Sequence, residues 1–248
     1  MKSFATFGLL ALAHLALGAP VGMDGSNAAG TQALDRRAVV DHDSLSPLAQ
    51  TVQAGAVGEA IARFSPKLRI ASGCEPYTAV DANGNVSGGV KPGGRDRTNC
   101  GDPYRGQTYA RAGTVQGKFC IMYSWYMPKD QPRSDTIGAH RHDWENVVVC
   151  TDAAMQTVTN GAASGHGKYK KTTSVPLDGT NVKVEYFTNF PTNHELQFTD
   201  DTRGFTKPIM DWDAMPQAMR DALNTADFGA ASVPFKDSSF MSNLNNAQ

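Results

Sequence analysis

Alternating side chains predict a long strand that begins near Gly117. One alternate set includes Phe119 and Trp125 and the other includes Cys120 and Tyr126, so both faces are largely apolar. A strand with this pattern is buried on both sides, because each face packs against another layer of the protein. The stretch therefore predicts a central strand of a sheet.

Two more strands are predicted at residues 143–150 and 181–188, which read DWENVVVC and NVKVEYFT and alternate with the period of a strand. Residues 127–139 connect the long strand to the first of these and contain the proline, glycine and polar residues typical of loops. Sequential strands joined by a loop pair antiparallel, so we expect these two to be neighbours.

Two helices are predicted outside the strands. Residues 46–64 carry apolar residues at near-helical spacing, with Ser46 as the N-cap and Pro47 at the first helical position. Residues 216–223 indicate a short helix with Asp213 as a candidate cap. With few helices and no strand–helix–strand alternation, the chain is predicted to be mainly β, a sandwich of two antiparallel sheets with peripheral helices.

The four cysteines include no Cys-x-x-Cys pair, which favours disulfides over a zinc site in an exported chain. Cys74 and Cys100 are the first predicted pair. Their bridge would close the turn-rich segment 81–97 and stabilise the fold by about 3 kcal/mol.

The register of the central strand pair follows from its two cysteines. Placing Cys120 opposite Cys150 also places Tyr126 opposite Trp144. Directly opposed residues are within disulfide reach after small adjustments, so a second bridge is predicted. Two buried free cysteines are the alternative.

The N-terminus indicates export. Residues 1–18 have a basic residue, a short apolar core and small residues at the end, as in a secretory signal peptide. Residues 19–37 form a polar linker or a propeptide that ends in Arg36-Arg37. Residues 38–248 are then expected to fold as a single domain, secreted and extracellular.

Charge excludes some partners. A net charge of −1 gives no electrostatic basis for binding nucleic acid, and no run of lysine or arginine would hold an anionic membrane by itself. The one glycosylation sequon, Asn85-Val86-Ser87, fits a surface loop.

The segment GAHRHDWENVVVC, residues 138–150, concentrates ionisable groups at the start of a predicted strand. The strand period places Asp143 and Glu145 on one face, where their like charges need a cation between them. His140 has the opposite parity, but at the strand end the chain can turn its ring toward the same point. With Asp130 from the neighbouring loop, this oxygen-rich set favours Mg²⁺ or Ca²⁺.

Other interpretations of this segment stay open. His140 and His142 can be taken as a zinc pair completed by His166 or His194, which would make the protein a hydrolase. The charged residues can also simply form surface salt bridges. A serine hydrolase lacks its Gly-x-Ser-x-Gly motif in this chain.

Some residues have a structural interpretation of their own. Arg141 is expected to pair with nearby acids, His142 and Trp144 to lie in the core, and His166 to be solvated in a glycine-rich loop.

Four motifs resemble the necrosis- and ethylene-inducing protein-like family. They are AHRHDWE, IMYSWYMPKDQP, GCEPYTAVDANGNVSGG and DFGAASVPFKDSSF, and the resemblance extends over roughly residues 38–245. It implies a secreted cytolysin without catalytic turnover, with a β-sandwich similar to actinoporins and fungal lectins. Such a protein would bind glycosyl inositol phosphorylceramide, a plant sphingolipid, through a divalent cation and damage eudicot plasma membranes. A non-cytolytic secreted relative that acts in recognition is the alternative.

The resemblance also implies roles for individual residues. The cation would be held by Asp130, His140, Asp143 and Glu145. The sugar- and membrane-facing loops would contribute Asp81, Asn85, Phe190, Asn193 and His194. A plant pattern-recognition receptor would detect residues 121–145, and the protein would be a monomer in solution.

The chain departs from the family pattern at a few positions. Ala139 replaces a glycine, which is compatible with a negative φ and costly with a positive one. Phe190 replaces a tryptophan and keeps an apolar tip without the indole N–H. Asn193 stands where an aspartate also occurs, and Cys120 and Cys150 replace apolar residues.

Overall fold

The computed structural model describes residues 37–132, 138–189 and 193–248, and residues 37–248 form one compact unit. The signal peptide and nearly all of the predicted linker lie outside the described residues. The strands are β1 (Val39–Val40), β2 (Lys67–Ile70), β3 (Val86–Ser87), β4 (Thr108–Val115), β5 (Lys118–Asp130), β6 (His140–Thr151), β7 (Val158–Gly165), β8 (Lys168–Thr172), β9 (Leu177–Asp178), β10 (Asn181–Thr188), β11 (His194–Phe198) and β12 (Ile209–Asp211). The helices are α1 (Ala56–Arg63), α2 (Gln217–Thr225) and α3 (Phe240–Asn246).

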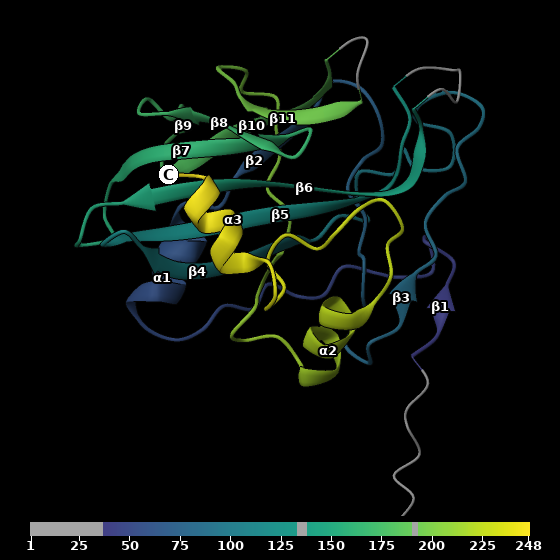
Figure 1. Cartoon of the computed structure of the whole chain (residues 1–248), viewed down its shortest axis with the longest axis horizontal. Helices are drawn as coiled ribbons and strands as arrows, with labels where there is room; N and C mark the ends of the chain where they lie inside the picture. The colour runs from purple at the N-terminus through teal and green to yellow at the C-terminus, as the bar shows by residue number, and fades with distance from the viewer. Residues whose placement is uncertain (1–36, 133–137, 190–192) are drawn as a thin grey trace, which may run out of the picture. The chain divides into compact units, whose positions relative to one another are not determined.

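Two main sheets form the body of the fold (Figure 1). The larger sheet has the order β12-β4-β5-β6-β7-β8, and the smaller has the order β11-β10-β2 with β9 beside β10. The two sheets pack face to face. Their close approach is visible at Gly161 of β7, where an added Cβ would lie 2.7 Å from the Phe198 ring of β11. The predicted mainly β sandwich is confirmed.

Most neighbouring strands are antiparallel, as predicted, but each main sheet also contains one parallel pair. β2 runs parallel to β10, and β12 runs parallel to β4. Both pairs join segments that are far apart in the sequence, so no hairpin forces them to run in opposite directions. β10, the middle strand of the smaller sheet, lies between these two kinds of neighbour.

The central pair β5–β6 has the predicted register. Cys120 lies opposite Cys150, and Tyr126 lies opposite Trp144. Both disulfides are present, Cys120–Cys150 and Cys74–Cys100.

The two central strands are longer than the sequence pattern suggested. β5 continues through the segment predicted as a loop up to Asp130, and β6 begins already at His140. Asp130 is therefore not a loop residue but the last residue of β5, directly opposite His140.

The predicted helix at residues 46–64 is mostly wrong. Only α1 is helical, and it begins after Gly55, which has a φ of 84°. The residues before it are extended, and the Leu48 N–H donates to Gln107 Oε1 at 2.7 Å. Gly58 lets the extended segment pass closely, because a Cβ there would lie 1.6 Å from the Gln53 carbonyl oxygen.

The C-terminal region contains α2 close to its predicted position, although Asp213 is not its cap. It also contains α3, whose polar sequence FMSNLNN gave no helical signal. The segment between the two helices packs Phe228 and Phe235 edge-on against Trp144 of β6, which confirms Trp144 as a core residue. No helix in the described ranges has the length and apolar content needed to cross a membrane.

Candidate functional site

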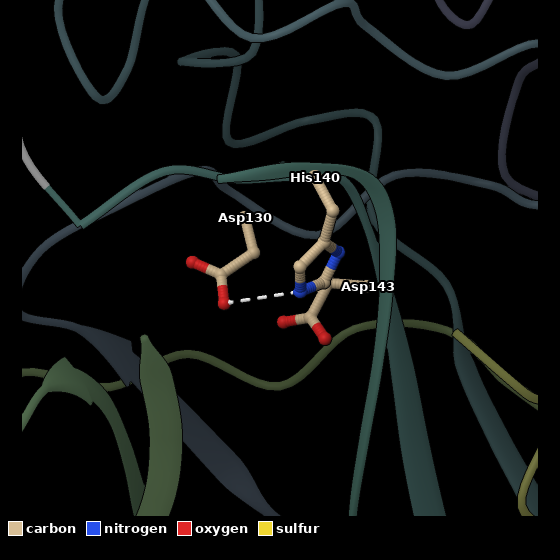
Figure 2. Close-up of side chains that lie close together, drawn as sticks. All are labelled: Asp130, His140 and Asp143. Atoms are coloured by element: carbon tan, nitrogen blue, oxygen red, sulfur yellow. Dashed lines mark ion pairs between the residues drawn. The ribbon is translucent and has the colours of Figure 1, made fainter. Parts of the chain in front are cut away.

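Three ligand-type side chains meet where β5 ends and β6 begins. Asp130, His140 and Asp143 each offer an atom within 4.8 Å of the other two, and Figure 2 shows their side chains converging. His140 Nε2 lies 3.6 Å from Asp130 Oδ2. Asp130 is 2% exposed and Asp143 is 7% exposed, so two carboxylates are held close together out of water.

A left-handed residue brings His140 to the acids. His142 has a φ of 61°, a conformation that is uncommon for residues other than glycine. It interrupts the strict alternation of β6, so His140 and Asp143 point to the same place despite their opposite parity. The structure thus turns the His140 ring toward the acids, as the sequence allowed.

The same local geometry sets the protonation of the His140 ring. Its Nδ1 lies 2.7 Å from the carbonyl oxygen of His142. A carbonyl only accepts hydrogen bonds, so Nδ1 carries a proton and Nε2 is the ring nitrogen that faces the acids. A neutral imidazole in this tautomer is suited to bind a metal ion.

The surroundings of Asp143 favour its protonated form. Burial, together with the nearby Asp130 carboxylate, raises the pKa of Asp143 to about 7. The Tyr186 hydroxyl donates to Asp143 Oδ2 at 2.8 Å and opposes this effect. Because two buried carboxylates repel, a bound cation would stabilise both charges.

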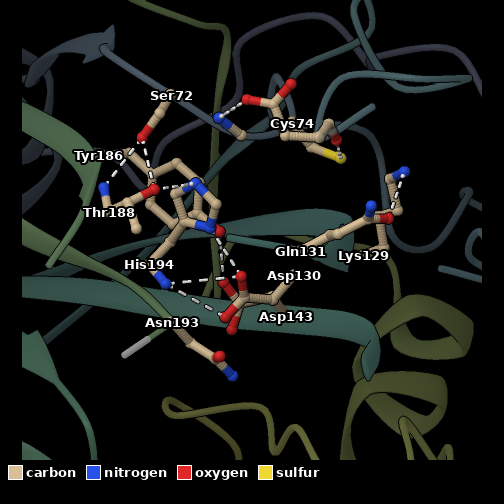
Figure 3. A network of polar contacts seen from close by, with 12 residues as sticks. Ser72, Cys74, Lys129, Asp130, Gln131, Asp143, Tyr186, Thr188, Asn193 and His194 are labelled. Carbon is tan, nitrogen blue, oxygen red and sulfur yellow. Dashed lines mark hydrogen bonds and ion pairs between the residues drawn. The ribbon is translucent and has the colours of Figure 1, made fainter. Parts of the chain in front are cut away.

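Asp130 is oriented by a chain of hydrogen bonds from β10 and β11 (Figure 3). His194 Nδ1 lies 2.6 Å from Asp130 Oδ1, and its Nε2 lies 2.9 Å from Thr188 Oγ1. Thr188 Oγ1 is in turn 2.9 Å from Ser72 Oγ. The pattern is satisfied when a neutral His194 donates from Nδ1 to the carboxylate and accepts from Thr188 at Nε2.

The His194 ring is also fixed by packing. It stacks on Tyr186, with ring centroids 4.7 Å apart and planes 16° from parallel. On the other side, a Cβ at Gly73 would lie 2.5 Å from His194 Nε2. Gly73 has a φ of 78°, and it precedes the disulfide residue Cys74. Only a glycine leaves room for the ring at this position.

Glu145, the fourth predicted ligand, does not join the group of three. It is 7% exposed and accepts a short hydrogen bond from the Ser164 hydroxyl. Burial and the neighbouring Asp143 charge raise the pKa of Glu145 well above its usual value. It nevertheless lines the same cavity, two residues further along β6.

That cavity has a volume of about 270 Å³ and opens over the three converging side chains. Its lining residues are Asp130, His140, Asp143, Trp144, Glu145, His166, Gly167, Asn193, His194, Ala230, Ala231 and Ser232. The predicted sugar-site residues Asn193 and His194 therefore belong to it. Asn193 Nδ2 donates to the Gly138 carbonyl oxygen at 2.8 Å, which ties the start of β11 to the segment before β6.

The other predicted sugar- and membrane-facing residues are placed differently. Asp81 and Asn85 do not line the cavity. They form a turn in which Asn85 Nδ2 donates to Asp81 Oδ2 at 2.8 Å. Phe190 lies outside the described residues.

The zinc interpretation finds no support in the placement of His142. Its Nδ1 lies 2.6 Å from the Tyr126 hydroxyl, and its ring packs edge-on against Phe228, so it is the predicted core histidine. Burial and the Arg141 charge lower the pKa of His142 to about 4.

The remaining charged residues depart in part from expectation. Arg141 donates to the Gly88 carbonyl oxygen at 2.6 Å, and no acid within residues 37–132, 138–189 and 193–248 forms an ion pair with it. His166 is exposed as predicted, but its Nε2 also lies 3.6 Å from Glu195 Oε2 at the cavity edge. Ala139 is not among the described residues with positive φ, so its methyl group carries no backbone strain.

Several residues that support the site had no sequence signal. Tyr186, Thr188 and Ser72 are ordinary strand and loop residues until tertiary packing brings them to the acids. Lys129 gave a weak signal, since a lysine lies within an otherwise buried strand. It is fully buried and donates to the carbonyl oxygens of Gly93 and Arg95.

The fold and the cavity define a class of protein, a β-sandwich with a polar cavity whose Asp–His–Asp cluster can hold a metal ion. The chain belongs to the necrosis-inducing protein family, since the family profile described as necrosis inducing protein (NPP1) matches residues 58–247. It is 42% identical over 217 residues to the necrosis-inducing protein NPP1 of Phytophthora nicotianae, an alignment covering 84% of this chain and 90% of that protein.

Solved structures agree with this assignment. The fold is similar to that of NLPPya in complex with mannosamine, with a TM-score of 0.79 and 44% identity over 85% of this chain and 99% of that one. It is also similar to the non-toxic HaNLP3 protein, with a TM-score of 0.79 and 36% identity over 84% of this chain and 98% of that one. The resemblance stated from the sequence is therefore confirmed.

Proposed function

We propose that this protein is a secreted cytolysin that binds the headgroup of glycosyl inositol phosphorylceramide through a divalent cation and damages eudicot plasma membranes. The observation that carries the proposal is the buried cluster of Asp130, His140 and Asp143 beneath an open polar cavity. Two buried carboxylates as close together as those of Asp130 and Asp143 are stable in their ionised form only when a cation lies beside them. Signal residues 1–18 would direct export.

The donor set suits a hard cation. Two carboxylates and one imidazole would bind Mg²⁺ or Ca²⁺, and open coordination positions would face the cavity. A cation placed there accepts sugar hydroxyl oxygens as further ligands. Glu145, two residues along β6, would accept hydrogen bonds from the same sugar or from a cation-bound water.

The sugar part of the proposal rests on the cavity and on a relative. NLPPya has been solved in complex with the amino sugar mannosamine. In this chain, Asn193 and His194 line the cavity beside the cation cluster, so they would contact the first sugar ring. Asp81, Asn85 and Phe190 are proposed to contact the headgroup or the bilayer from the neighbouring loops.

The test is leakage of vesicles made from eudicot plasma membrane. Asp143→Ala is expected to abolish leakage, because the cation site loses a carboxylate, and chelator is expected to do the same to the unaltered protein. Asp200→Ala is the matched control, since this aspartate is 99% exposed at its side chain and remote from the cluster in sequence. Equal leakage from the unaltered protein and Asp143→Ala, with both folded, would overturn the cation role.

A second function is favoured by one observation, the similarity to a protein described as non-toxic. In that case the chain would bind the headgroup without damaging the membrane. Vesicle binding without leakage, together with leaf infiltration that causes no necrosis, identifies this alternative. Ala139→Gly is expected to change neither result, because Ala139 is not among the described residues with positive φ.

Receptor detection of residues 121–145 is proposed to require release of the segment from the fold. Residues 121–130 of β5 and 142–145 of β6 are buried. A receptor would therefore meet this sequence as a peptide rather than on the folded surface.

A further inference from the structure

A second cavity of about 280 Å³ adjoins the cation cavity. The two share four lining residues, Trp144, Glu145, Gly167 and Ser232. They are therefore consecutive parts of one trough, and a ligand that enters the first part meets the second without leaving the surface.

The trough has a defined shape. Its floor is formed by β6 residues 144–146, and one wall by residues 164–169 of β7, β8 and the turn between them. The opposite wall is formed by residues 232–234 and by α3, which contributes Asn243 and Asn246. Strand, hairpin and helix residues therefore supply most of the lining.

The lining is polar but almost uncharged. Among the described residues that line it, Glu145 is the one acid and Lys168 the one base. A second metal ion would need more carboxylates, and an anionic group would need more cations. The chemistry instead fits a neutral ligand with many hydroxyl groups.

Hydrogen-bonding groups remain available in the trough. Asn146 is 5% exposed, and its Oδ1 accepts from the Tyr169 hydroxyl at 2.8 Å, which fixes the side chain and leaves Nδ2 without a protein partner within the described chain. Glu145 Oε1 and the exposed Asn246 side chain also have no protein partner among residues 37–132, 138–189 and 193–248. Asn146 Nδ2 and Glu145 Oε1 are not among the buried unpaired atoms of the described chain, so water reaches them and a ligand hydroxyl would replace that water. The Trp144 side chain lines both cavities, and its Nε1 is buried without a partner among the described residues, although buried polar groups normally have one.

We propose that the trough is a second sugar subsite, which binds the next ring of the glycan whose first ring lies at the cation. This inference rests on the proposed function and extends it from one sugar to two. Asn146 Nδ2 would donate to a ring hydroxyl and Glu145 Oε1 would accept from one. Each cavity is slightly smaller than typical small-molecule sites of about 300–1,000 Å³, which suits one ring in each.

The test compares mannosamine with a set of disaccharides that carry mannosamine at one end and differ in linkage, by isothermal titration in the presence of Ca²⁺. The unaltered protein is expected to bind at least one disaccharide about tenfold more tightly than mannosamine. Asn246→Trp fills the trough from α3 and is expected to remove this ratio while leaving mannosamine affinity unchanged. Asn245→Trp, at the neighbouring exposed position outside the trough, is expected to keep the ratio.

The outcomes separate the subsite from the proposed function. Equal affinities for mannosamine and every disaccharide, or a ratio that survives in Asn246→Trp, would overturn the subsite. Loss of mannosamine binding in Asp143→Ala reports on the proposed function alone. Matching thermal unfolding midpoints for the two tryptophan variants show that both are folded.

Discussion

The Thr188 hydroxyl group hydrogen-bonds to the imidazole of His194, which in turn hydrogen-bonds to Asp130. Groups that orient metal ligands in this way typically change metal affinity about 10–100-fold when removed. Thr188→Ala is expected to weaken Ca²⁺ or Mg²⁺ binding by this factor, measured by isothermal titration. Thr188→Ser keeps the hydroxyl and is expected to restore most of the affinity. If both variants bind the cation equally well, His194 is not positioned through Thr188.

Asp143 would link binding of the proposed cation to stability. Its pKa is raised from 3.8 to about 7, so the folded state binds this proton more tightly than the unfolded state. Without a cation, the protein therefore loses stability as the pH rises from about 4 through about 7.

Asp143→Asn does not titrate and is expected to unfold at a higher temperature than the unaltered protein at pH 8 in chelator, with no such difference near pH 4. For a domain of this size each kcal/mol corresponds to about 2–4 °C. Thermal unfolding across this pH range measures the effect. A difference that is the same at every pH would show that Asp143 titration does not contribute.

At the level of residues, sequence parity placed Asp143 and Glu145 together and left His140 to an unspecified turn. The structure supplies that turn at His142, whose positive φ no sequence rule required. The hydrogen-bond chain through Ser72, Thr188 and His194 could not be predicted either, because these residues come from separate parts of the chain. Hydrogen bonds between distant segments have no periodicity to detect.

The two disulfides stabilise different elements. Removing either one by paired alanine substitution is expected to cost about 2–4 kcal/mol in the free energy of unfolding, measured with denaturant. Only the Cys74–Cys100 bridge adjoins the site, since Ser72 and Gly73 precede it and contact Thr188 and His194. Figure 3 shows Cys74 beside this network.

Cys74→Ala with Cys100→Ala is therefore expected to weaken cation binding as well as stability. Cys120→Ala with Cys150→Ala is the matched control and is expected to lower stability alone. Equal cation affinities in the two double variants would separate the first bridge from the site.

At the level of elements, the sequence pattern predicted strands reliably where both faces of a strand are buried. It predicted structure poorly in short amphipathic segments. The register of β5 and β6 was predictable because two cysteines and two aromatic residues had to match. The helix prediction was wrong for residues 46–55 because the pairing of Thr51 with Met210 overrides the helical spacing of the apolar residues.

For the whole molecule, binding of the proposed cation would be coupled to folding. An ion that binds only the folded state raises stability by about 2.7 kcal/mol at one hundred times its dissociation constant. Ca²⁺ or Mg²⁺ is therefore expected to raise the unfolding temperature of the unaltered protein, and chelator to reverse this. Asp143→Asn is expected to show no shift with either ion. A shift of equal size in that variant would place the ion elsewhere.

The sandwich as a whole could be predicted from its strands, but its parallel pairs could not. β2 and β10 are joined by more than a hundred residues, and nothing in their local sequence selects the direction of pairing. The position of the C-terminal segment beside β6, which completes the trough, depends on the packing of Trp144 against Phe228 and Phe235. Such contacts arise only once the tertiary fold is formed.

The Cys120–Cys150 bridge lies at one end of the β5–β6 ladder, and the Asp130–His140 pair lies at the other. A slip of the two strands by two residues would keep every side chain on its correct face, yet it would separate both pairs at once. In the slipped pairing the two thiols are no longer opposite each other and cannot join. The disulfide therefore selects the strand alignment that also brings the acids together at the far end of the ladder.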